Sequence, residues 1–127
     1  MVFLPFFRNL YKIVKRNKNI KKEKKERIDM ISVKVYQQGN DLVIGACDEH
    51  LLGKKFRDGK LQIDVAKHFY EGERIDKKTL KKFLLDATIA NLVGKETVKC
   101  AIELGLVNPD CILKIKGVPH AQIVRMF

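Results

Sequence analysis

Apolar and polar residues alternate along the chain from residue 31 onward, and this period of two is typical of half-buried β-strands. Residues 31–36 show the alternation first, and the Gly39-Asn40 pair that follows suits a tight turn. The apolar stretch 42–44 then predicts the returning strand of a β-hairpin. Residues 61–65 alternate in the same way and predict a third strand.

The spacing of apolar residues becomes helical in the middle of the chain. Asp76 is a suitable N-cap for a helix over 77–86, whose apolar positions recur at intervals of three and four residues. The small, apolar stretch 87–93 predicts a second helix packed tightly inside the protein. Residues 97–104 predict a third helix, with Gly105 placed to terminate it.

Two further strands are predicted near the end of the chain, over 112–115 and 121–126, with a turn between them. The expected order is therefore β-β-β-α-α-α-β-β. Strands at both ends of a helical middle favour the α+β class. We expect a largely antiparallel sheet with the helices packed on one face.

The first 29 residues differ from the rest in charge. The chain has a formal net charge of +11, and ten of its 26 Lys and Arg residues lie in 1–29, which carry +7 against +4 for 30–127. Apolar residues also recur at helical spacing over 1–14. We therefore predict a basic, flexible or helical extension over 1–29 and a single domain over 30–127. The extension is either a tail, an over-long translated start, or an anchor for a membrane surface or RNA, and the membrane anchor is the least favoured.

The cysteines and the hydropathy indicate where the protein works. Three widely spaced cysteines do not form a disulfide framework, so a reducing cytoplasm is expected. No run of 18 apolar residues is present, and the apolar start lacks the features of a signal peptide. The basic composition suits a polyanionic partner such as RNA.

The densest polar cluster is Cys47-Asp48-Glu49-His50, which follows the second strand. A small enzyme would use Cys47 as nucleophile, with Asp48 and His120 beside it, if the fold brings them together. We expect Cys47-Asp48 and Pro119-His120 to lie at the same end of the sheet. A structural zinc site would need two more ligands at suitable spacing, so no metal and no cofactor are predicted.

A second cluster is basic: Lys54, Lys55, Arg57 and Lys60 fall within seven residues around a predicted turn. Such a loop suits phosphate groups of RNA, which lysine and arginine contact as point charges. A simple solvated loop is the alternative interpretation.

Four motifs resemble those of a domain-of-unknown-function family of small archaeal proteins. They are Cys47-Asp48-Glu49-His50-Leu51-Leu52-Gly53-Lys54, Phe69-Tyr70-Glu71-Gly72, Ala87-Thr88-Ile89-Ala90-Asn91-Leu92-Val93-Gly94 and Gly117-Val118-Pro119-His120-Ala121-Gln122. The resemblance covers about 30–127, and it departs from the family in residues 1–29 and at His50, where a glutamate is usual. It implies an archaeal cytosolic protein with a link to translation.

The sequence therefore favours a non-enzymatic binding module associated with RNA or the ribosome, acting through Lys54, Lys55, Arg57 and Lys60. The alternative is a small enzyme or metal-binding protein centred on Cys47, Asp48 and His120.

Overall fold

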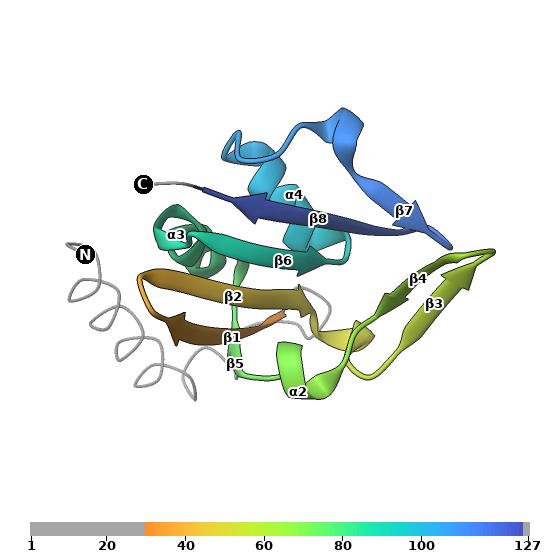
Figure 1. The fold of residues 1–127 in the computed structure, drawn as a ribbon, viewed down its shortest axis with the longest axis horizontal. Coiled ribbons are helices and arrows are strands. Elements are labelled where there is room, and N and C mark those ends of the chain that lie inside the picture. Colours follow the sequence, from red (N-terminus) through yellow and green to blue (C-terminus); the bar gives the residue numbers. More distant parts are fainter. Residues whose placement is uncertain (1–29, 126–127) are drawn as a thin grey trace.

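The computed structural model describes residues 30–125, which form a six-stranded sheet, a two-stranded sheet and three α-helices (Figure 1). The strands are β1 (Ile31–Gln38), β2 (Asp41–Asp48), β3 (Lys55–Asp58), β4 (Leu61–Asp64), β5 (Glu73–Ile75), β6 (Ile89–Val93), β7 (Leu113–Ile115) and β8 (Val118–Val124). The helices are α2 (Lys67–Tyr70), α3 (Lys77–Asp86) and α4 (Lys95–Glu103), with 3₁₀ turns η2 (Glu49–Leu51) and η3 (Pro109–Cys111).

The large sheet has the strand order β5-β1-β2-β6-β8-β7, and β3 and β4 form the small sheet. Neighbouring strands run antiparallel except for β2 and β6, which are parallel. A parallel pair needs a long crossover connection, and here that connection contains β3, β4, α2, β5 and α3. The predicted class, α+β with a largely antiparallel sheet, is confirmed.

The two longer helices, α3 and α4, lie on one face of the large sheet (Figure 1). Side chains alternate between the two faces of a strand, so consecutive residues of β2 pack into two different apolar clusters, one on each face of the sheet. Ala46 packs with the helices, in a cluster that includes Leu80 and Phe83 of α3. Cys47 points to the other face and packs with Tyr70 of α2 and with residues of the β3–β4 hairpin.

The predicted β1–β2 hairpin and the predicted helix over 77–86 are confirmed. The hairpin closes at Gly39, which has a φ of +60°. Helix α3 begins after Asp76, whose side chain accepts the N–H of Thr79 at 2.9 Å. Both elements carry their own start or turn residues, which explains why local sequence was sufficient to find them.

The predicted helix over 87–93 is wrong, because this stretch forms the central strand β6. A continuous apolar run of this length fits a strand buried on both faces as well as it fits a buried helix. Two contacts end α3 before the run begins. Arg125 donates to the carbonyls of Leu84 and Leu85, and Thr88 bonds both the N–H and the carbonyl of Leu42 at the start of β2.

The remaining differences concern short elements. Strand β3, strand β5 and helix α2 have three or four residues each and were not predicted. Strand β8 begins at Val118, whereas the sequence predicted a start at residue 121. The prediction was late because residues 117–120 were interpreted as a turn. Elements this short are stabilised mainly by contacts with distant parts of the chain. Gly72, for example, lies so close to the carbonyl of Val33 that no side chain fits there.

The predicted extension 1–29 lies outside the described residues, so its roles stay predictions. Within 30–125, none of the helices has the length and hydrophobicity needed to cross a membrane.

Candidate functional site

Strands β2 and β6 end, and β8 begins, at the same side of the sheet, next to the first turn of α4 (Figure 1). Cys47 lies beside Val93 in the sheet, and Val93 lies beside His120. The prediction that Cys47-Asp48 and Pro119-His120 share one end of the sheet is therefore confirmed.

Asp48, a predicted catalytic candidate, caps helix α4 from the end of β2. It is 2% exposed, and its carboxylate accepts the N–H of Glu96 at 3.2 Å and the N–H and hydroxyl of Thr97 at 2.9 and 2.8 Å. These N–H groups belong to the first helical turn and have no partner within the helix. A carboxylate is also favoured there by the helix dipole. The described contacts of Asp48 therefore assign it to the fold.

Cys47 is buried in an apolar cluster, and its thiol is poorly suited to act as a nucleophile. Burial raises the pKa of Cys47 to about 12, and the negative charges of Asp48, Glu49 and Glu71 add to this effect. Burial also lowers the pKa of His120. Strand β6 separates the two strands that carry Cys47 and His120, which places their backbones about 10 Å apart. This geometry does not favour the predicted enzymatic role, which stays an untested alternative.

The potential metal ligands are also dispersed. Within 30–125, no three or more His, Cys, Asp or Glu side chains come together in a group able to hold a metal ion. Cys111 is exposed on η3, whereas Cys100 is buried between α3 and α4, where its thiol lies 3.9 Å from the carbonyl of Lys77. His50 is exposed on η2 and lines a cavity described below.

The burial of the cysteines gives a direct test of their chemistry. Burial raises the pKa of Cys100 to about 11, while Cys111 is exposed. We expect the native protein at pH 8 to show one thiol that reacts rapidly with DTNB, because only the thiolate attacks the reagent. Three thiols should react after denaturation, and Cys111→Ser should remove the fast one. Rapid labelling of Cys47 in that variant would contradict the buried thiol and support the enzymatic alternative.

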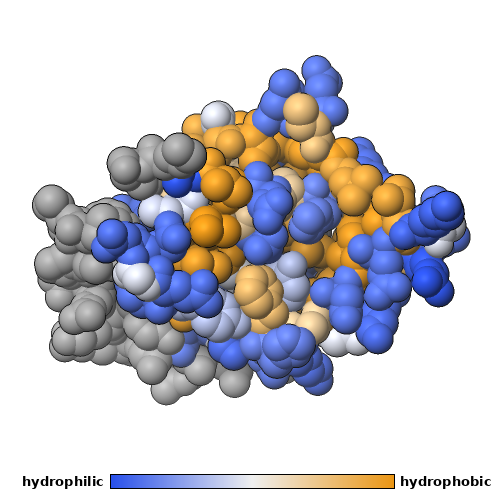
Figure 2. Space-filling view, in the orientation of Figure 1, coloured by the Kyte–Doolittle hydropathy of each residue, from blue (hydrophilic) through white to orange (hydrophobic). Residues whose placement is uncertain are grey.

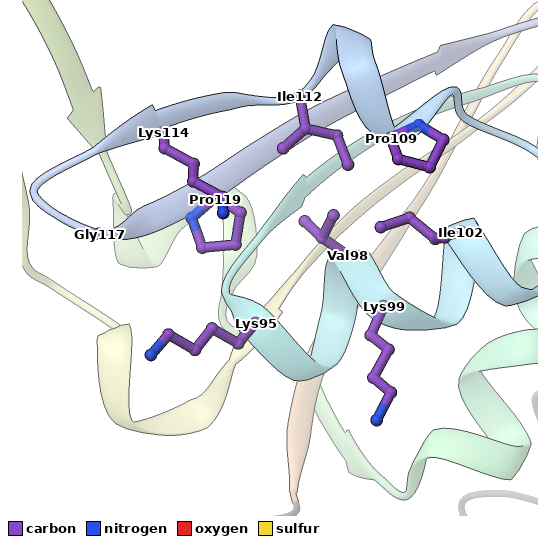
Figure 3. Close-up of a pocket in the computed structure, with 9 residues that line it drawn as sticks. All are labelled: Lys95, Val98, Lys99, Ile102, Pro109, Ile112, Lys114, Gly117 and Pro119. Atoms are coloured by element: carbon purple, nitrogen blue, oxygen red, sulfur yellow. The ribbon is translucent and has the colours of Figure 1, made fainter.

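A groove runs between α4 and the edge strand β7, on the same face of the sheet as the helices. Its cavity has a volume of about 320 Å³. Its lining residues, which define what we call the α4–β7 groove, are Lys95, Val98, Lys99, Ile102, Pro109, Ile112, Lys114, Gly117 and Pro119. Figure 3 shows that Val98, Ile102, Pro109 and Ile112 point toward one another and form an apolar centre.

A second cavity, of about 290 Å³, adjoins the first at the end of the sheet. The two share Lys95, Gly117 and Pro119, and the second also involves Lys116 and His50. Asp48 supplies the acidic side chain in this second lining, and its oxygens already bind α4. The combined walls are therefore strongly basic.

Four lysines line the two cavities: Lys95, Lys99, Lys114 and Lys116. All four are exposed, and none forms an ion pair with a carboxylate of residues 30–125. The spacing of these lysines in the sequence is a signal for the groove. Lys95 and Lys99 are four residues apart on a helix, so they share a face, and Lys114 and Lys116 flank Ile115 before a turn.

The predicted RNA-contacting residues Lys54, Lys55, Arg57 and Lys60 are all exposed on and before the β3–β4 hairpin. The hairpin packs against β7, since Ile63 and Ile115 share an apolar cluster. Its tip lies beside the β7–β8 turn (Figure 1). Figure 2 shows hydrophilic residues at that end of the molecule, on the right, next to an apolar area. The fold therefore brings the predicted basic loop to the end of the sheet that carries the lysines of the groove.

Lys116 occupies an unusual backbone conformation in the β7–β8 turn. Its φ is +53°, and it has the sole positive φ among the non-glycine residues of 30–125. Asparagine and glycine adopt this conformation at lower energetic cost than lysine. Ile115 pairs with Val118, so Lys116 and Gly117 form a two-residue turn in which both φ values are positive. The turn tolerates lysine at this position at an energetic cost.

These features define a small α+β protein with a lysine-lined groove at one end of a mixed sheet. A family model described as "Protein of unknown function (DUF424)" matches residues 36–126. The chain belongs to this family, which agrees with the predicted resemblance to a domain-of-unknown-function family. No curated protein matches the chain significantly.

The fold is similar to the crystal structure of an uncharacterised conserved protein from Methanopyrus kandleri. The TM-score is 0.62 at 22% sequence identity, over 77% of this chain and 95% of that one. At this level of identity the similarity concerns the fold alone.

Proposed function

We propose that the protein is a non-enzymatic binding module that associates with RNA, including ribosomal RNA. The observation that supports this most is the lysine-lined groove. Its side walls carry Lys95, Lys99 and Lys114, with Lys116 in the adjoining cavity, and no carboxylate of 30–125 neutralises these charges by an ion pair. A concave surface with an excess of positive charge concentrates negative charge, and the RNA backbone supplies negative charge at regular intervals.

The β3–β4 hairpin adds basic residues at the same end of the sheet, although it packs on the face opposite the groove. Lys54, Lys55, Arg57 and Lys60 lie at the same end of the sheet as the groove, on a projecting element (Figure 1). Two basic elements on one end can contact phosphates that are separated along a strand or across a fold. The proposal includes the expectations of a cytoplasmic, archaeal setting and a role near translation, which the resemblance of the four motifs supports.

A charge-reversal variant tests the proposal. We expect Lys95→Glu with Lys114→Glu to weaken binding of a fluorescent 20-nucleotide RNA by about tenfold at low salt, because two phosphate contacts are lost and two repulsions appear. The slope of log affinity against log salt should flatten by about 1.4, at roughly 0.7 for each contact with a single strand. Fluorescence anisotropy measures both quantities.

The matched control is Lys78→Glu with Lys82→Glu, which makes the same change in net charge on exposed positions of α3. It should bind nearly as the unchanged protein does. Equal weakening by the two double variants would show that only net charge matters and would refute a specific surface. Absence of the full chain from every RNA-bearing fraction of a low-salt sucrose gradient of cell lysate would refute the proposal itself.

A further inference from the structure

We propose that the α4–β7 groove holds an unstacked base of single-stranded RNA, with adjacent phosphates on Lys95, Lys114 and Lys116. This inference rests on the proposed RNA binding and specifies which form of RNA the groove accepts.

The apolar centre of the groove is the first argument. In a duplex the faces of the bases are stacked inside the helix, so a protein that binds a duplex through its phosphates contacts no base face. Such a protein surface needs positive charge and has no need of apolar side chains. Here Val98, Ile102 and Ile112 converge in a groove whose lining also includes Lys95, Lys99 and Lys114 (Figure 3). Ile102 and Ile112 remain partly exposed at the edge of the helix-side core. A base face removed from water against these side chains uses the hydrophobic surface that a duplex would leave solvated.

The dimensions and the position of the charges are the second argument. A volume of about 320 Å³ lies at the lower end of the range for small-ligand sites, so it suits one base and its sugar rather than a helix. Lys95 and Lys114 lie at the end of the groove near Pro119 (Figure 3), where the second cavity begins. A strand with one base in the apolar centre would therefore continue into a cavity walled by Lys116.

The backbone of Lys116 is the third argument. A lysine held at a φ of +53° costs stability that asparagine or glycine would not. Strain of this kind is common where a side chain is needed for function. At this position the lysine places a positive charge in the wall of the second cavity, where the next phosphate would lie.

The experiment compares a 20-nucleotide single strand with the duplex of the same sequence in fluorescence anisotropy at one salt concentration. We expect the single strand to bind about tenfold more tightly. Ile112→Ser should reduce single-strand affinity about fivefold, because the floor loses most of its apolar side chain, while duplex affinity and the salt slope stay unchanged. Leu85→Ser is the matched control on an apolar side chain of α3 that is 55% exposed, and it should leave both affinities unchanged.

Two further measurements keep the test independent of the folding of one variant. Lys116→Asn should raise the melting temperature and still weaken RNA binding, which a merely damaged fold would not do. Titration of the unchanged protein with adenosine monophosphate should shift the NMR methyl signals of Val98, Ile102 and Ile112. Equal affinity for single strand and duplex, with no methyl shifts, would overturn this inference and leave RNA binding intact. Failure of the unchanged protein to bind either RNA at low salt would overturn the proposed function as well.

Discussion

Asp48→Ala is expected to lower the free energy of unfolding by about 3 kcal/mol, since it removes the acceptor of three hydrogen bonds at the start of α4. Two N–H groups and the hydroxyl of Thr97 would lose their partner in a site that is almost completely buried. Unfolding by urea, followed by circular dichroism, measures the change.

Asp48→Asn separates the cap from the charge, because asparagine is a good N-cap that can still accept from Thr97. We expect it to cost about 1 kcal/mol. Asp41→Ala, at an exposed position on the same strand, should change stability by no more than about 0.5 kcal/mol. If Asp48→Ala were as stable as Asp41→Ala, the hydrogen bonds to α4 would be dispensable, and the carboxylate would again be a candidate for chemistry.

Gly94→Ala is expected to destabilise the protein by about 4 kcal/mol, through two effects at one residue. Gly94 has a φ of 110° and a ψ of 155°, a combination open to glycine and hardly to other residues. An added Cβ would also lie within 2.7 Å of both carboxylate oxygens of Asp48. The midpoint of denaturation should fall accordingly.

Gly105→Ala provides the comparison for Gly94→Ala. Gly105 has a φ of 71° with open space around the position of the added atom, so it reports backbone strain alone, at about 1 kcal/mol. The double variant Asp48→Ala, Gly94→Ala should be less destabilised than the sum of the two single variants, because removing the carboxylate relieves the clash. Strictly additive losses would show that the clash is absorbed elsewhere.

The sequence was informative where an element carries its own signals. The β1–β2 hairpin has strict alternation and a glycine turn, and α3 has an aspartate cap. Strand β6 has neither, and its burial on both faces makes it resemble a core helix. The strand conformation of β6 depends on β2, which pairs with every residue of β6. The two strands are far apart in the sequence: Leu42 and Thr88, which are hydrogen-bonded, are separated by 46 positions. No local pattern records a neighbour at that distance.

For the candidate site, too, local features could be predicted and contacts between distant residues could not. The prediction that Cys47-Asp48 and Pro119-His120 lie at one end of the sheet is confirmed, since β2 ends there and β8 begins there. The partner of Asp48 could not be read from the sequence, since the N–H groups it accepts lie 48 and 49 positions away. The groove was missed because its lysines come from helix α4 and from the β7–β8 hairpin, two segments that only the folded chain brings together.

The parallel pairing of β2 with β6 also affects the protein during its synthesis. Strand β2, apolar along almost its whole length, is complete some forty residues before β6 leaves the ribosome. Until then one of its edges has no partner in the chain, and an unpaired apolar edge is a template for aggregation. The β1–β2 hairpin can form locally and protects the other edge. A nascent chain that stalls before residue 89 would therefore expose the unpaired edge of β2. Uninterrupted translation through β6 thus protects this protein from aggregation.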